Sequence, residues 1–388
     1  MPTLKTIDAM FSDAVERKAM PGVVAAAAND RGLLYEGGFG RRDITGTAAM
    51  TADTVVWIAS MTKAITATAA MQLVERGKLA LDAPAATIVP ELAAAKVLDG
   101  FDAAGQPRLR APKRPITLRH LLTHTAGYGY EIFSAAIAQY QTATNTPGIT
   151  TCTNAALTTP LLFDPGDRWE YGINIDWAGK MVEAVSGQRL DRYLQQNILG
   201  PLGMNDTSFR LSTAQRARLA SVHQRGPDGA LAPIEFELPQ EPEFMMGGGG
   251  LYGTAGDYLR FGQMIMRGGT LDGTPVLRPE TVDLMGQNHI GPLEVGAVKS
   301  AIPALSNDVE LFPGMSTKWG LSFVINTQPL PTGRSANSLA WAGLANTYFW
   351  IDRTKQVCGV FLSQVLPFFD ATAVDLFVKF ETEIYRAL

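Results

Sequence analysis

Residues 64 to 74 (AITATAAMQLV) carry no charged side chain, and this run restricts how the chain can fold. Glu75, Arg76 and Gly77 follow directly, which is typical of a helix that ends with a glycine C-cap. The sequence therefore predicts a helix that begins at Lys63 and is buried on most of its sides. Other elements of the fold must cover it.

Ser60 precedes Lys63 by three residues, and the two form the only Ser-x-x-Lys sequence of the chain. Three residues turn a helix by about 300°, so the hydroxyl and the amine project from the same face and can touch. A serine hydroxyl becomes a nucleophile when a base takes its proton, and burial favours the neutral amine that can act as this base. The pair is thus predicted to form an acyl-transfer site, with the helix N-terminus holding the oxyanion. The alternative is an N-cap serine followed by a surface lysine.

The composition argues against several other classes of function. The chain has 388 residues, 46% hydrophobic and 18% charged, which is enough for a large core, and its net charge of −4 offers no basic patch to a nucleic acid. Residues 1 to 19 mix charges with apolar residues, unlike a signal peptide, and no later segment resembles a membrane span, so we expect a cytoplasmic protein. Cys152, Cys358 and four scattered histidines have no metal-ligand spacing, so neither a metal nor a cofactor is expected.

The order of the expected elements predicts the fold class. Strands are expected at 23–28, 33–40, 318–327, 337–342, 346–352 and 356–364. Helices are expected at 3–18, 64–74, 117–124, 175–186, 190–198, 255–267 and 369–387, and residues 128–165 are expected to form a long functional loop. Strands at both ends predict an α/β fold of the α+β type, with one antiparallel sheet built from both termini and flanked by helices. Residues 1–56 and 315–388 would form the sheet domain, and residues 57–314 an inserted, mostly helical domain with a cleft between them.

Four sequence motifs, in this order, resemble those of a known superfamily. They are Ser60-Met61-Thr62-Lys63, then LLTHTAG at 121–127, then Pro165-Gly166 followed by Trp169-Glu170-Tyr171, and finally Trp341-Ala342-Gly343. A glycine-rich turn at 247–251 adds to the pattern. The chain resembles the serine β-lactamases and penicillin-binding proteins, and within them the class C-like esterases known as family VIII carboxylesterases. The resemblance covers nearly the whole chain and implies a β-lactamase/transpeptidase-like fold.

The resemblance also implies roles for individual residues. Ser60 would be the acylated nucleophile, Lys63 its base, and Tyr171 the tyrosine that passes a proton to the leaving group and later activates water. Tyr128 and Tyr130 remain alternatives for this tyrosine, because their loop is expected to border the cleft. The oxyanion hole would consist of the backbone N–H groups of Ser60 and Leu344.

Two positions depart from the β-lactamase pattern. Trp341 stands where those enzymes usually have a Lys or His that helps to hold the carboxylate of the substrate. Ile173 replaces the asparagine two positions after the tyrosine, although Asn174 is adjacent. Both changes favour an uncharged, apolar acyl group. The expected substrate contacts are Trp341, Gly343, Tyr128 and Ile173.

Two further patterns are interpreted as structural. Residues 248–253 (GGGLYG) match the dinucleotide-binding fingerprint, but a preceding parallel strand and a following acidic residue in a βαβ unit are missing, so a tight turn beside the cleft is expected. His124 has no Gly-x-Ser-x-Gly elbow to pair with and is expected to be a buried histidine at a helix end.

The sequence therefore predicts a serine esterase that hydrolyses carboxylic esters with short, uncharged acyl groups through an acyl-enzyme on Ser60. The same chemistry leaves open a β-lactamase, a D-amino-acid peptidase, or an acyltransferase that passes the acyl group to an alcohol. A non-catalytic scaffold is disfavoured because Ser60, Lys63 and Tyr171 are all present. The expected partner is a small-molecule ester, with no nucleic acid and no membrane.

Overall fold

The computed structural model describes residues 2–388, and an antiparallel sheet of seven strands forms its centre. The strand order is β11-β12-β13-β14-β15-β1-β2. The strands are β1 (Gly22–Asn29), β2 (Gly32–Gly40), β11 (Thr317–Trp319), β12 (Val324–Asn326), β13 (Leu339–Gly343), β14 (Thr347–Asp352) and β15 (Val357–Leu362). Strand β1 pairs with β15, so the two ends of the chain build one sheet. The predicted α+β fold with a sheet from both termini is confirmed.

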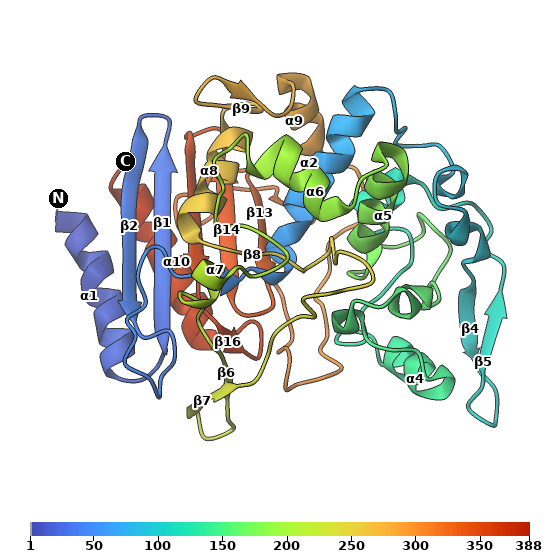
Figure 1. Ribbon diagram of the computed structural model, residues 1–388, viewed down its shortest axis with the longest axis horizontal. Helices are drawn as coiled ribbons and strands as arrows, with labels where there is room; N and C mark the ends of the chain where they lie inside the picture. The colour runs from blue at the N-terminus through green and yellow to red at the C-terminus, as the bar shows by residue number, and fades with distance from the viewer. Residues whose placement is uncertain (1) are drawn as a thin grey trace.

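Helices cover both faces of this sheet (Figure 1). Every residue of β1 is buried, as expected for an apolar strand with packed neighbours on both sides. Helices α1 (Pro2–Glu16) and α10 (Ala371–Arg386) cover one face, where Phe11 lies 5.9 Å from Phe380 between ring centroids. Helix α8 (Ala255–Met266) packs on the other face against β1, β14 and β15.

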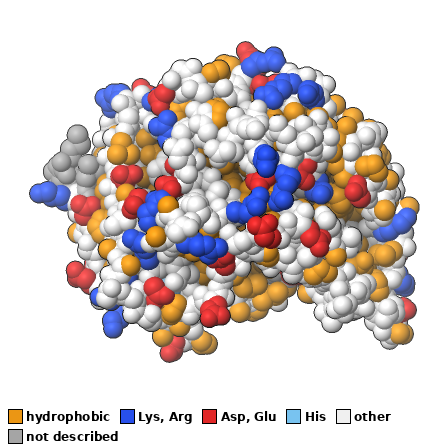
Figure 2. Space-filling model, in the orientation of Figure 1, with side chains coloured by type: hydrophobic (Ala, Val, Ile, Leu, Met, Phe, Trp, Pro, Cys, Tyr) orange, Lys and Arg blue, Asp and Glu red, His pale blue; other side chains and the backbone are white. Residues whose placement is uncertain are grey.

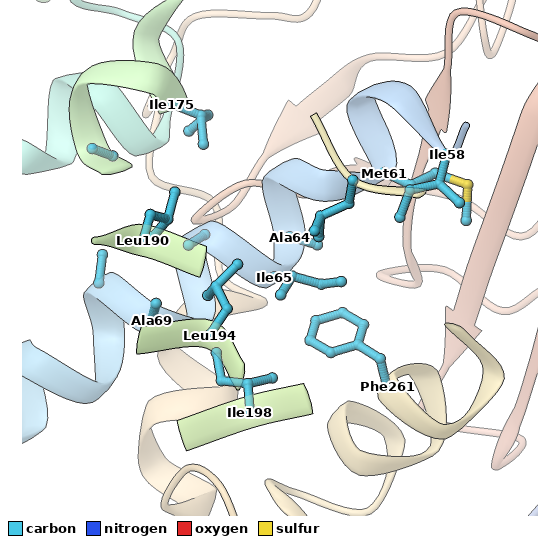
Figure 3. Close-up of a cluster of buried hydrophobic side chains, with 14 of the residues drawn as sticks. Ile58, Met61, Ala64, Ile65, Ala69, Ile175, Leu190, Leu194, Ile198 and Phe261 are labelled. Atoms are coloured by element: carbon cyan, nitrogen blue, oxygen red, sulfur yellow. The ribbon is translucent and has the colours of Figure 1, made fainter. Parts of the chain in front are cut away.

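The uncharged helix is the centre of the second part of the molecule. A 3₁₀ turn at Ala59–Met61 leads into α2 (Thr62–Glu75), and every residue from Thr62 to Leu73 is buried, as predicted. Figure 3 shows Ala64 and Ile65 of α2 in a cluster of buried apolar side chains with Leu190, Leu194 and Phe261. The surrounding helices are α5 (Asn174–Ser186), α6 (Leu190–Leu194) and a π-helical turn at Gln195–Leu199.

The remaining elements are short. The other helices are α3 (Leu118–Leu122), α4 (Ala135–Thr144), α7 (Thr213–Arg216) and α9 (Pro279–Met285), with 3₁₀ turns at Ala85–Thr87, Pro90–Ala94, Ile149–Thr151 and Asn154–Thr158. Small sheets pair β3 (Val56–Trp57) with β8 (Tyr252–Gly253), β4 (Val97–Phe101) with β5 (Pro107–Arg110), and β9 (Thr270–Leu271) with β10 (Thr274–Pro275). A third strand, β16 (Val365–Leu366), joins β6 (Val222–Arg225) and β7 (Leu231–Ile234).

Two expected elements differ in the structure. The segment 128–165 is not one loop, because it contains α4, whose N-cap Ser134 accepts a hydrogen bond from the N–H of Ile137 and whose C-cap Asn145 is left-handed. The expected strand 318–327 is two strands, β11 and β12, joined by a turn in which Ser322 has a φ of 76°. A left-handed residue cannot continue a strand, so the chain reverses there.

The domain division and the cellular location stay predictions. Helix α8 belongs to the segment 57–314 but packs directly on the sheet. Within residues 2–388, no helix is both long and apolar enough to cross a bilayer. Figure 2 shows acidic and basic side chains interspersed over one face of the molecule, in keeping with the small net charge of −4.

Candidate active site

Ser60 lies where the short strand β3 turns into α2, at a backbone position held from several sides. The preceding residue, Ala59, is buried and has a φ of 46°, a left-handed conformation that costs a non-glycine residue about 1–2 kcal/mol. The side chain of Gln364 fixes this segment by bonding both the N–H and the C=O of Trp57, at 3.1 and 3.0 Å. The strained turn thus presents the Ser60 side chain to a pocket.

The Lys63 amine is fully buried and contacts three oxygens. Its Nζ lies 3.0 Å from the Ser60 Oγ, 3.0 Å from the Tyr130 hydroxyl and 2.5 Å from the carbonyl oxygen of Gly248. A neutral amine has two N–H groups and one lone pair. When the N–H groups donate to Tyr130 and Gly248, the lone pair faces the Ser60 hydroxyl, which is the arrangement a general base requires.

The protonation of Lys63 suits this role. Burial lowers the pKa of Lys63 to about 7, while the negative charge of Asp176 opposes the shift. The neutral amine therefore predominates above about pH 7, close to the pH at which a general base works best. The physical cause is desolvation, as expected for an amine inside an uncharged helix.

Tyr171 completes the cluster around the nucleophile. Its hydroxyl interacts with the side chain of Ser60 and accepts a hydrogen bond of 3.1 Å from the indole N–H of Trp341. Burial raises the pKa of Tyr171, so the phenol keeps its proton and is suited to donate it rather than to act as a free phenolate. The structure brings Ser60, Lys63 and Tyr171 together, as the sequence predicted.

Trp341 has a contact that the sequence analysis missed. Its indole N–H is already used by Tyr171, and its ring packs edge-on against Trp319 at 4.6 Å and Tyr171 at 4.9 Å between centroids. Trp341 therefore orients the tyrosine as well as lining the pocket. No local pattern indicates this contact, because 170 residues separate the two side chains.

The pocket above Ser60 is lined almost entirely by aromatic and aliphatic side chains. It has a volume of about 60 Å³ and shares Leu311, Trp341 and Ala342 with an adjoining cavity of about 340 Å³. Its walls are Trp57, Ala59, Ser60, Tyr130, Ile132, Phe133, Ile149, Thr150, Tyr171, Met246, Gly249, Val309, Leu311, Trp341, Ala342, Gly343, Leu344 and Phe368. A site of this kind favours an apolar ligand group.

Two expected substrate contacts are not on these walls. The ring of Tyr128 stacks on Trp177 at 6.2 Å, and Ile173 is buried at the start of α5. Tyr130, which the sequence analysis kept as an alternative for the catalytic tyrosine, lines the pocket and contacts Lys63 instead.

The two backbone groups expected to form the oxyanion hole both belong to pocket-lining residues, Ser60 and Leu344. The end of β13 touches the Ser60 segment, since a Cβ on Gly343 would lie 2.3 Å from the carbonyl oxygen of Ile58. Glycine at 343 thus permits this close approach. The role of the two N–H groups stays a prediction.

The glycine-rich turn at 247–251 supplies acceptors to the active-site segment. Its successive carbonyls at Gly247, Gly248 and Gly249 accept from the Thr66 hydroxyl at 2.8 Å, the Lys63 amine, and the Trp57 indole N–H at 2.7 Å. The predicted turn beside the cleft is therefore present, and it also positions the base.

His124 is fully buried beneath Tyr171, at 4.8 Å between ring centroids. Its Nδ1 lies 3.0 Å from the side-chain nitrogen of Asn174. Burial and the nearby Lys63 hold the pKa of His124 well below its usual value. The histidine is thus neutral and contacts Tyr171 rather than Ser60, in agreement with the structural interpretation.

The fold and this cluster define a class of enzyme, the serine acyl-enzymes of the β-lactamase type. The profile of the beta-lactamase family matches residues 7–381, so the chain belongs to this family. The narrower assignment to family VIII carboxylesterases is not established by this match.

Relatives in this family include transferases and esterases. The chain is 33% identical to a monacolin J acid methylbutanoyltransferase of Aspergillus terreus, over 98% of this chain and 95% of the relative. It is also 33% identical to a lovastatin esterase of Penicillium rubens, over 98% of each chain. The unliganded simvastatin synthase of Aspergillus terreus superposes with a TM-score of 0.88 at 31% identity, over 100% of this chain and 99% of that one. The protein is therefore an enzyme of the serine hydrolase and acyltransferase superfamily.

Proposed function

We propose that this enzyme is a serine esterase that cleaves carboxylic esters with short, uncharged acyl groups, similar to the family VIII carboxylesterases. The contact between the buried Lys63 amine and the Ser60 hydroxyl carries the proposal, because it pairs a nucleophile with a neutral base. The apolar pocket above them supports the choice of acyl group. A small-molecule ester is thus the proposed partner.

The proposed reaction starts from the contacts that Ser60 makes with Lys63 and with Tyr171. Lys63 takes the Ser60 proton while Oγ attacks the ester carbonyl, and the N–H groups of Ser60 and Leu344 receive the oxyanion. As the carbon–oxygen bond to the alcohol breaks, Tyr171 gives its phenolic proton to the leaving alkoxide and is restored by the proton that Lys63 holds. Water then attacks the acyl-enzyme, with the same groups moving protons in the reverse direction.

Esters should be strongly preferred over anionic β-lactams. None of the residues that line the pocket within the described chain is charged, so a substrate carboxylate would lose water without gaining a cation. Losing a charge-assisted hydrogen bond costs about 1.5–3 kcal/mol, or roughly ten- to a hundredfold in binding. We expect kcat/KM for p-nitrophenyl butyrate to exceed that for a chromogenic cephalosporin by at least this factor.

A substitution tests the cause of this preference. Trp341→Lys should move the ratio of the two kcat/KM values toward the cephalosporin, whereas Trp341→Met, which removes the indole without adding charge, should not. Both variants should lower ester hydrolysis, because Tyr171 loses the indole N–H. A wild-type enzyme that cleaves both substrates equally fast would favour a β-lactamase instead.

Acyl transfer to an alcohol is the second candidate, favoured by the identity of 33% to a methylbutanoyltransferase over 98% of this chain. Both reactions share the acyl-enzyme and differ only in the acceptor. If the enzyme is a transferase, millimolar 1-butanol should convert p-nitrophenyl butyrate largely to butyl butyrate, measured by gas chromatography. If butyrate is the main product at every butanol concentration, the enzyme is an esterase rather than a transferase. The Ser60→Ala variant, which lacks the nucleophile, serves as the control for the uncatalysed reaction.

A further inference from the structure

A buried carboxylate lies next to the catalytic cluster and has no part in the reaction described above. Asp176 is in the first turn of α5, five residues after Tyr171, and is completely buried. Its Oδ1 accepts a hydrogen bond of 2.8 Å from the N–H of Gly248. Within the described chain, no hydrogen-bond donor reaches its Oδ2. A buried carboxylate with an unpaired oxygen is costly unless a nearby charge compensates it.

Gly248 connects this carboxylate to the base. Its N–H donates to Asp176, and its carbonyl accepts from the Lys63 amine. The approach is so close that a Cβ on Gly248 would lie 2.5 Å from the Asp176 Oδ2. Gly248 therefore fixes the position of the Asp176 carboxylate relative to the Lys63 amine.

The charges of the two groups affect each other. Burial raises the pKa of Asp176 to about 6, and Lys63 opposes this rise. The Asp176 charge in turn raises the pKa of Lys63 against the effect of burial. At pH 7 and above, Asp176 is therefore mainly ionised and faces an amine that alternates between its neutral and charged forms.

The phenols, the thiol and the histidine around the pair are mainly neutral at this pH. Burial raises the pKa values of the phenols Tyr130 and Tyr171 and of the thiol of Cys152, and it keeps His124 unprotonated. The nearby Glu131 contributes to the raised pKa of Tyr130, and burial raises the pKa of Glu131 itself. Among residues 2–388, Asp176 is thus the one charged group that shifts the pKa of Lys63 electrostatically.

We propose that Asp176 is a positioning residue of the acyl-enzyme reaction, whose carboxylate, held through Gly248, stabilises the Lys63 ammonium that forms when Ser60 gives up its proton. The proposal rests on the proposed function in that Ser60 must be the nucleophile. In this step the proton moves from Ser60 Oγ to Lys63 Nζ and does not pass on to Asp176, so the carboxylate stays ionised. This arrangement matches the general logic in which a third group supports the base of a nucleophile.

The test is Asp176→Asn, which keeps an oxygen for the Gly248 N–H and removes only the charge. The readout is the rate at which a p-nitrophenyl phosphonate labels Ser60 between pH 5 and 10, because labelling needs an activated serine but no natural substrate. We expect the maximal rate to fall by about tenfold, part of the roughly hundred- to ten-thousandfold that a general base contributes. The midpoint of the pH profile should also move to lower pH, because Lys63 loses the charge that raises its pKa.

Asp257→Asn is the matched control. Asp257 also lies in the first turn of a helix, and burial likewise raises its pKa to about 6. Its carboxylate accepts hydrogen bonds from the N–H of Asp206 and the hydroxyl of Thr207, and neither of these groups contacts Lys63. This variant should keep the wild-type midpoint. A purely structural role of Asp176 would leave the midpoint of Asp176→Asn unchanged as well, and that result would overturn the inference.

A reciprocal measurement requires no variant at position 176. Because coupling between two sites is mutual, Lys63→Met should raise the pKa of Asp176 and add a protonated-carboxyl infrared band at pH 7 relative to the wild type. An unchanged spectrum would overturn the inference. If the phosphonate leaves wild-type Ser60 unlabelled, the proposed function itself fails. If Ser60 is labelled but both tests show no coupling, only the role of Asp176 fails.

Discussion

Ser60→Ala should lower kcat/KM for short p-nitrophenyl esters by at least about four orders of magnitude, because no acyl-enzyme can form without the hydroxyl. The fold should be retained, since Lys63 keeps its contacts with Tyr130 and Gly248. Activity assays and thermal unfolding measure the two effects separately. Ser186→Ala, at the last residue of α5 and outside the pocket lining, is the control and should keep the wild-type activity.

A phosphonate label identifies the nucleophile directly. Peptide mass spectrometry should find the label on Ser60 and on no other residue, and Ser60→Ala should take up none. A label on another serine, or an active Ser60→Ala enzyme, would contradict the assignment of the nucleophile.

Lys63→Arg should be nearly as damaging as Lys63→Ala, with losses in kcat/KM of about a hundredfold or more. Arginine keeps a positive charge but cannot release its proton at working pH, so it cannot act as a base. The guanidinium is also larger than the amine, which is fully buried and already contacts Ser60, Tyr130 and Gly248. If Lys63→Arg kept most of the activity, the amine would be structural and the base would lie elsewhere.

The pH profile of the wild type provides a second test of the same base. The pKa of Lys63 is lowered to about 7, so the amine is protonated and inactive below this value and neutral above it. The value of kcat/KM should therefore rise with pH, with a midpoint near 7, and Lys63→Ala should lack this rise. The midpoint belongs to the coupled group of Lys63 and Asp176 rather than to one residue alone.

Much of the fold could be predicted because its signals are local. The apolar strand at 22–29, the hairpin after it and the uncharged helix α2 each follow from a short stretch of sequence. The break between β11 and β12 could not be predicted in this way, because the turn at Ser322 is held by the carbonyl of Leu122, about two hundred residues earlier. Helix α4 carries local signals as well, namely the N-cap Ser134 and the helix-favouring alanines that follow it, so it could have been predicted.

The contacts of the site likewise differ in whether a local sequence pattern predicts them. Ser60 and Lys63 are three residues apart, so helix geometry alone predicts their contact. The partners that make Lys63 a base come from elsewhere in the chain: Tyr130 is 67 residues away and Gly248 is 185. The resemblance to a known family supplied Tyr171, but it gave no sign of the indole contact from Trp341 or of the buried Asp176.

The pairing of β1 with β15 has a consequence for synthesis of the protein on the ribosome. Strand β1 is apolar on both faces, and its partner β15 (Val357–Leu362) is synthesised long after it. Leu344, whose backbone N–H is predicted to contribute to the oxyanion hole, is also synthesised long after Ser60. A nascent chain therefore carries an unpaired, aggregation-prone strand edge beside an incomplete active site until β15 has been synthesised. Catalysis then begins only when the sheet closes.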